Sequence, residues 1–153
     1  MTVIDKIRES VAAIQENNVP YFYMGKWSDA ASELNDSNVN AILQGKLFPF
    51  IFLYLDINED VNAKSGFNTA SVYIYLIKES EENVSHEWRH DNSFPELRII
   101  ETDLLKSFKN KGVTIDSYKR IEWFYDVSEA NKLNADIDVI QLSIPNFIYY
   151  TKC

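Results

Sequence analysis

The five residues from His86 to His90, His-Glu-Trp-Arg-His, have the H-E-x-x-H spacing of zinc hydrolases. In such sites two imidazoles one helical turn apart bind the metal, and the glutamate acts on the metal-bound water. The imidazoles must project from one stable helix face, and a third ligand must complete the site. His86, Glu87 and His90 are therefore the candidate zinc-binding and catalytic residues of this sequence.

The surrounding sequence favours a structural role for this motif. Ser93, followed three residues later by Glu96, has the pattern of a helix N-cap with a capping box, so we expect a new helix to begin after the motif. If the motif forms a separate short helix whose inward side includes Val84, His86 lies about 200° from Val84 around the helix axis, and its side chain points to solvent. Glu96, at the third-ligand position, is assigned to capping. We interpret the motif as an exposed polar connection packed through Trp88, with no metal, cofactor or catalytic residue.

Other candidate chemistry is limited to pairs of acidic residues. Asp136 with Asp138, and Glu59 with Asp60, supply the oxygen ligands that hard cations prefer. Each pair is expected in a turn or at the start of a strand, where solvated carboxylates are ordinary, so we predict no metal there. The sequence contains no glycine-rich phosphate loop and no G-x-S-x-G motif, and its one cysteine is Cys153.

Composition indicates a folded domain that does not bind nucleic acid. The 153 residues are 46% hydrophobic, and a net charge of −8 opposes affinity for phosphate backbones. The apolar run Leu47–Leu55 is about half as long as a membrane-spanning helix, which needs about 20 residues. The charged N-terminal stretch does not resemble a signal peptide. We therefore expect a protein made and kept in the cytoplasm, with no membrane contact.

Hydrophobic periodicity predicts helices at residues 2–17 and 93–112. The first has an apolar stripe through Val3, Ile7 and Val11, and the second begins at Ser93 and ends at Gly112. β-rich segments are expected in five places: residues 20–27, 48–57, 67–78, 117–127 and 137–144.

The connections between these segments differ in character. Residues 58–66 have the composition of a turn, and residues 28–45 form a polar segment that includes a predicted short helix. In the strand 117–127, apolar and polar residues alternate, which is typical of a half-buried strand. The apolar phase slips between Val139 and Ile140, which indicates either a bulge or burial on both faces. Pro145 is expected to limit pairing, so that residues 145–153 form an edge or a tail.

The order of these segments favours an α+β fold. Short connections between adjacent strands favour a mainly antiparallel sheet of about five strands, with two principal helices packed mostly on one face. We expect a single domain over residues 1–153, with the sheet and second helix spanning residues 48–144.

This order of elements resembles the tail terminator and tail completion proteins of tailed bacteriophages. The resemblance extends from Pro49 to Ile144 and, with the first helix, covers most of the chain. Its segments are FPFIFLYL, SVYIYLI, ELRIIETDLLKSF, YKRIEWFYDV and DIDVIQLSI. The closing strand pair contributes a charged pattern made by Arg120, Glu122, Asp126, Asp136, Asp138 and Val139. Residues 28–45 have no counterpart in this resemblance.

The resemblance implies a non-enzymatic virion protein. Such proteins form a ring, commonly a hexamer, that caps the tail tube and joins it to head-completion or connector proteins, while DNA passes through the lumen without specific binding. An acidic surface suits a channel to which DNA does not adhere. Two alternatives remain open: a small cytoplasmic binding or immunity-type module, and a zinc hydrolase that uses His86, Glu87 and His90.

Overall fold

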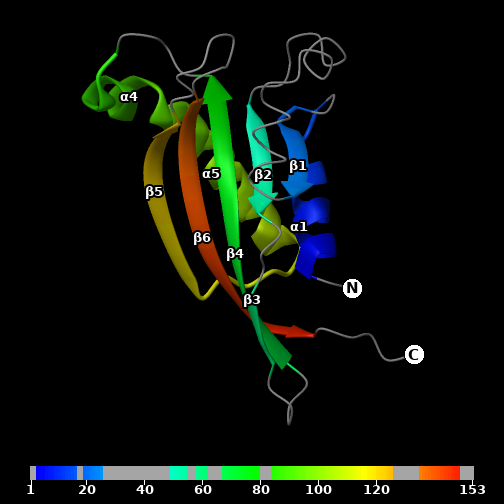
Figure 1. Ribbon diagram of the computed structural model, residues 1–153. Coiled ribbons are helices and arrows are strands. Elements are labelled where there is room, and N and C mark those ends of the chain that lie inside the picture. The colour runs from blue at the N-terminus through cyan, green and yellow to red at the C-terminus, as the bar shows by residue number, and fades with distance from the viewer. Residues whose placement is uncertain are drawn as a thin grey trace.

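The computed structural model describes residues 3–16, 19–25, 49–54, 58–61, 67–79, 84–125 and 135–148. Within them it has an α+β architecture, which confirms the predicted fold class (Figure 1). The described elements, in chain order, are α1 (Val3–Ala12), β1 (Tyr21–Gly25), β2 (Phe50–Tyr54), β3 (Asn58–Val61), β4 (Phe67–Glu79), α4 (His86–Asn92), α5 (Phe94–Asn110), β5 (Ser117–Tyr125) and β6 (Ala135–Ile148).

The sheet is mainly antiparallel, as predicted. Its main path runs β1-β2-β4-β6-β5, and β3 pairs with the first part of β4 beside β2. β3 falls within residues 58–66, which were predicted to be a turn only. β1 and β2 are parallel, whereas every other pair is antiparallel. The strands β1 and β5, at the two ends of this path, therefore run in opposite directions.

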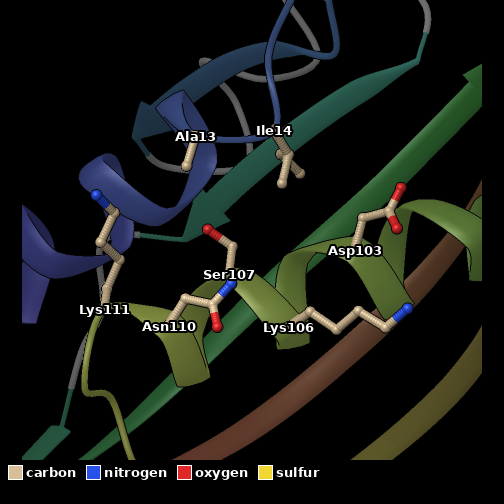
Figure 2. Close-up of a pocket in the computed structure, with 7 residues that line it drawn as sticks. All are labelled: Ala13, Ile14, Asp103, Lys106, Ser107, Asn110 and Lys111. Atoms are coloured by element: carbon tan, nitrogen blue, oxygen red, sulfur yellow. The ribbon is translucent and has the colours of Figure 1, made fainter.

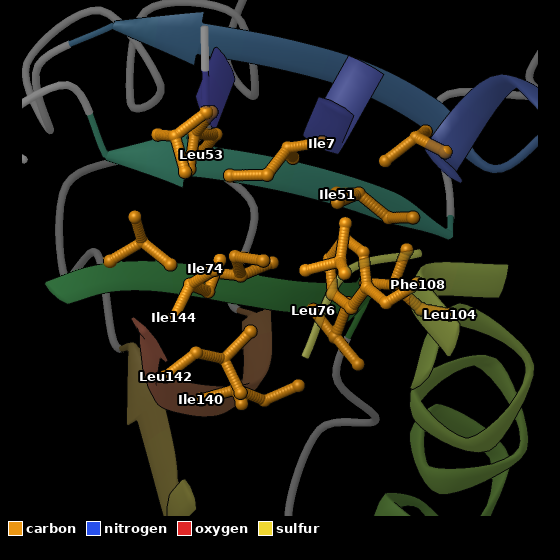
Figure 3. Packing of buried hydrophobic residues seen from close by; sticks show 14 of the residues in the cluster. Ile7, Ile51, Leu53, Ile74, Leu76, Leu104, Phe108, Ile140, Leu142 and Ile144 are labelled. Carbon is orange, nitrogen blue, oxygen red and sulfur yellow. The ribbon is translucent and has the colours of Figure 1, made fainter. Parts of the chain in front are cut away.

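The main hydrophobic core lies between the sheet and the helices α1 and α5. Figure 3 shows apolar side chains from α1, α5, β2, β4 and β6 directed into this shared space. On α1 the predicted stripe Val3, Ile7 and Val11 is buried, although this helix ends at Ala12 rather than at residue 17. The fully buried side chains of Ile74 and Phe108 join the centre of the sheet to α5.

A second, smaller cluster occupies the opposite face of the sheet. Its members in the described part of the chain all come from strands: Phe50, Phe52, Ile77 and Ile137 are buried, and Tyr21, Tyr23, Tyr54, Tyr75 and Val139 pack around them half-buried. Tyr21 stacks on Phe50, with ring centroids 5.4 Å apart, and Tyr75 lies 5.7 Å from Phe52. In Figure 1 the helices α1 and α5 lie behind the sheet, on the other side.

Strand β6 is buried on both of its faces. Ile137 belongs to the aromatic side, whereas Ile140, Leu142 and Ile144 face the helices. Pairing with β4 is regular through Val139 and Ile140, so burial on both faces accounts for the slip in apolar phase. The register shifts instead near Pro145, where two residues of β6 lie opposite one of β4. β6 then continues to Ile148, but in the described residues it pairs with β5 only as far as Ser143 and beyond that with β4 alone. The end of β6 therefore runs along an edge, as predicted for the residues after Pro145.

The end of α5 has the geometry that its sequence predicts. Gly112 has φ +77°, a left-handed conformation that glycine adopts without steric cost. The Val113 N–H donates to the Phe108 carbonyl, and the Gly112 N–H donates to the Lys109 carbonyl. These two bonds form a Schellman motif, which satisfies carbonyl groups at the helix end.

Two predictions lie outside the described residues: the short helix within residues 28–45 and the course of the chain beyond residue 148.

Candidate functional site

The H-E-x-x-H motif lies on a helix of its own, α4. The Ser85 side chain accepts a hydrogen bond from the Trp88 N–H and caps the start of this helix. α4 meets α5 at Ser93, which has helical backbone angles and whose N–H donates to the Arg89 carbonyl. The motif thus forms a separate short helix that leads into α5.

The predicted capping box at Ser93 was wrong. The Ser93 side chain makes no capping bond at the start of α5. Its hydroxyl instead donates to Asp136 Oδ2 on β6, over 2.5 Å. Glu96 is also engaged elsewhere, because its carboxylate lies 2.6 Å from Lys78 Nζ on β4. A serine at a junction between two helices can bond to the sheet beneath it, which the local pattern does not reveal.

Both histidines approach one carboxylate, that of Glu122 on β5. The Nδ1 atom of His90 is 2.6 Å from Glu122 Oε1, and the Nε2 atom of His86 is 3.5 Å from Oε2. The side chains of His86 and His90 are 57% and 55% exposed, so the predicted exposure of His86 is confirmed. Glu87 is exposed as well. The sequence did not indicate that the two imidazoles share Glu122, which lies 36 residues after His86 and 32 after His90.

Glu122 is also bonded to α5. Arg98 Nη2 donates to Glu122 Oε1, and the carboxylate is only 15% exposed. Burial opposes ionisation of this group, but hydrogen bonds from His90 and Arg98 outweigh it and hold the pKa of Glu122 below its ordinary value. Glu122 is therefore a carboxylate that is kept ionised between a cation and two imidazoles.

Asp138 lies directly across from Glu122 on β6 and is fully buried. Neither of its carboxylate oxygens has a hydrogen-bond partner. Arg98 Nε is 3.9 Å from Oδ2, which is within ion-pair distance but too long for a hydrogen bond. Burial, and then the negative charge of Glu101, raises the pKa of Asp138 to about 7, although Arg98 and Arg120 act in the opposite direction. This carboxyl group can therefore exchange a proton near neutral pH.

Two further ion pairs complete this region. The Arg89 Nε of α4 lies 3.2 Å from Oδ1 of the fully buried Asp136. Glu101 of α5 is 2% exposed, and it accepts hydrogen bonds from the Tyr118 hydroxyl and, over 3.0 Å, from Arg120 Nε. The expectation that Asp136 and Asp138 are solvated was wrong, because β6 places both side chains beneath α4 and α5.

We name this set the charged cluster. It has four carboxylates, three arginines and two histidines, and its members are His86, Arg89, His90, Arg98, Glu101, Arg120, Glu122, Asp136 and Asp138. With every carboxylate ionised and both histidines neutral, its charge is −1. The arrangement can therefore bind and release protons, and it joins α4, α5, β5 and β6 through charge.

The charged cluster does not have the arrangement of a metal centre. Among the residues that the structure describes, no group of three or more histidine, cysteine, aspartate or glutamate side chains is placed to hold a metal ion. At Glu122 the carboxylate is already bonded to Arg98, a cation that a metal would have to displace. The side chains of the other predicted pair, Glu59 and Asp60, lie outside the described residues.

An open groove lies between α1 and α5, away from the charged cluster (Figure 2). Its volume is about 470 Å³, and it is lined by Ala13, Ile14, Asp103, Lys106, Ser107, Asn110 and Lys111. The Ser107 hydroxyl donates to the Ser10 carbonyl over 2.7 Å and so joins the two helices. The groove carries opposite charges on its wall and contains no member of the charged cluster.

Comparison with known proteins gave no family. The sequence matches no family model and none of the curated proteins with which it was compared. No helix within the described ranges is long and apolar enough to span a membrane.

Proposed function

We propose that this protein is a non-enzymatic structural component of a virion, a ring-forming tail terminator or head–tail joining protein. In this role it caps the tail tube, contacts the tube and the head-completion or connector proteins, and lets DNA pass. The observation that carries the proposal is the aromatic face of the sheet, defined by Tyr21, Tyr23, Phe50, Phe52, Tyr54, Tyr75, Ile77, Ile137 and Val139.

The aromatic face has the composition of a surface for self-association. Its phenylalanines and isoleucines are already buried within the chain, so the area open to a second copy comes from its half-buried tyrosines, a residue type that is enriched at protein interfaces. The face continues onto β5, where Ile121 pairs with Val139 and is 63% exposed. An exposed isoleucine paired with half-buried Val139, which pairs in turn with Tyr75, is consistent with contact to another subunit.

The directions of the end strands are compatible with a ring. Since β1 and β5 run in opposite directions, β5 of one copy can lie antiparallel to β1 of the next without inverting either copy. Contacts of this head-to-tail kind use two different surfaces of each subunit, and they form a closed ring when the rotation between copies closes.

The acidic composition is consistent with a channel for DNA. A net charge of −8 repels the phosphate backbone, so a ring made of this chain would let a duplex pass without holding it.

Within the described residues the two most exposed large hydrophobic side chains, Ile99 and Ile121, lie on different elements, α5 and β5. They therefore offer a matched pair for testing which surface associates.

Light scattering at several protein concentrations tests the proposal. We expect a particle of several subunits, and we expect Ile121→Glu to dissociate it. Ile99→Glu introduces the same charge at a side chain of nearly equal exposure, 64%, and should leave the particle intact. A protein that stays monomeric or dimeric at every concentration would favour the small binding-module alternative, and loss of assembly in both variants would reject the assignment to the β5 side.

A further inference from the structure

We propose that the contact between α4 and β5 is a proton-linked switch that holds α4 against the sheet in mild acid and releases it as the pH rises above neutral. The contact consists of His86 and His90 on α4 and Glu122 on β5. This inference rests on the geometry of the charged cluster and goes beyond the proposed ring function, so either can fail without the other.

The contact between α4 and β5 depends on the two histidines. His86 and His90 lie one helical turn apart. One ring nitrogen of each histidine, Nε2 of His86 and Nδ1 of His90, is directed at the carboxylate of Glu122. Histidine changes charge between about pH 5 and 8. When the imidazoles are charged they form charge-assisted bonds with Glu122, which are about twice as strong as bonds between neutral groups. When they are neutral, the attraction between α4 and β5 weakens.

The second proton site, Asp138, acts in the same direction. It lies on β6, paired with Glu122 on the neighbouring strand β5, and Arg98 approaches both carboxylates. While Asp138 is protonated, Arg98 is bound to Glu122 alone. Ionised Asp138 competes for Arg98 and repels Glu122, so the binding site for the histidines is disturbed as they lose their own charge.

The contact itself consists of His86, His90 and Glu122, and the elements packed around it carry further charged or titratable groups. With those of the contact, the groups are His86, Glu87, Arg89, His90 and Asp91 on α4, Glu96, Arg98 and Glu101 on α5, Tyr118, Arg120 and Glu122 on β5, Asp136 and Asp138 on β6, and Lys78 on β4. Within the charged cluster the three arginines balance Glu101, Glu122 and Asp136. Its charge is thus +2 with both histidines charged and Asp138 protonated, and −1 after these three protons are lost.

One part of α4 is held independently of these protons. Arg89 and Asp136 form an ion pair on the sheet side of the helix, and arginine remains charged throughout this pH range. The release is therefore expected to be local: the histidine side of α4 separates from β5, while the junction with α5 stays in place.

Hydrogen exchange of the α4 backbone amides tests this switch. After correction for the intrinsic effect of pH on exchange, we expect protection of α4 to fall about fivefold between pH 5.5 and pH 8, because an ion pair made by a half-exposed side chain contributes at most about 1 kcal/mol. Protection of α5 should change much less. These are the chain's two histidines, so every imidazole signal in an NMR titration reports on this contact.

Variants separate this switch from general instability. The double variant His86→Asn, His90→Asn should remove most of the pH dependence of α4 protection, and Glu122→Gln should lower protection at pH 5.5 toward the value at pH 8. The matched control is Glu87→Gln, which changes an exposed charge of the same helix and should behave like the unmodified protein. Protection of α4 that is independent of pH, or equal pH dependence in the double histidine variant, would overturn the proposal.

Discussion

Replacing Asp138 by asparagine should change how the stability of this protein depends on pH. Asp138 is fully buried and its oxygens lack hydrogen bonds, so its ionised form is disfavoured in the folded state. Because the pKa of Asp138 is raised, the folded protein binds this proton more tightly than the unfolded chain does. The stability that this group contributes is complete below its ordinary pKa of 3.8 and is lost as the pH rises through about 7.

The size of this effect follows from the two pKa values. The interval between 3.8 and about 7, at about 1.4 kcal/mol for each pH unit, corresponds to about 4 kcal/mol of unfolding free energy as an upper limit. Arg98, which is 3.9 Å away, can move toward the ionised carboxylate and offset part of this cost. We therefore expect the measured loss between pH 4 and pH 8 to be about 2 kcal/mol.

Urea denaturation at a series of pH values measures the effect. Between pH 4 and pH 8 the unmodified protein should lose about 2 kcal/mol more unfolding free energy than Asp138→Asn does. The test is this difference in slope, because a buried asparagine also lowers stability by an amount that does not depend on pH. Asp103→Asn, the same change at an exposed site on α5, should leave the slope unaltered. Parallel pH profiles for the unmodified protein and Asp138→Asn would refute the reasoning.

Three further predictions concern single contacts. Arg89→Ala should lower the unfolding free energy by about 3 kcal/mol, because it removes the cation beside buried Asp136; a loss as small as that of exposed Lys106→Ala would contradict this role. Gly112→Ala should cost about 1 kcal/mol in urea denaturation, because φ is +77° and an added Cβ meets no atom within 4 Å; an unchanged midpoint would mean that the turn is not left-handed. Glu122→Gln should broaden or shift the NMR signals of both imidazoles, and unaltered signals would show that the histidines are not bonded to Glu122 in solution.

Local patterns predicted the elements that depend on neighbouring residues. Helix α5 was expected from its apolar stripe and from Gly112, and both the buried residues and the left-handed turn follow that pattern. The fold class followed in the same way, because strand segments with short connections favour antiparallel pairing. These features depend on residues a few positions apart, which a sequence displays directly.

The charged cluster could not be predicted in this way. Alternation on β5 separates Arg120 and Glu122 from Ile121, and the usual interpretation puts the apolar side inward. In the structure Ile121 is 63% exposed, whereas Glu122 is turned toward α4 and α5, where Arg98 bonds to it. Only the packing of α4 over the end of β5 brings His86 and His90 to this carboxylate. Contacts of this kind depend on distant residues, and no local spacing specifies them.

The role of Asp138 shows the same limit. Its sequence neighbours, Asp136 among them, have the composition of a solvated strand entry, yet both carboxylates are fully buried. Burial here results from the position of β6 between β4 and β5, under the junction of α4 and α5.

The mass of the assembled protein in solution tests the central proposal most directly. A ring-forming virion component is expected to give a single particle of several subunits, about six times the subunit mass of 17.8 kDa for a hexamer, at concentrations where Ile121→Glu gives smaller species and Ile99→Glu does not. The mass of a single subunit, 17.8 kDa, at every concentration, for the unmodified protein and both variants alike, would contradict the proposal that this protein forms a ring.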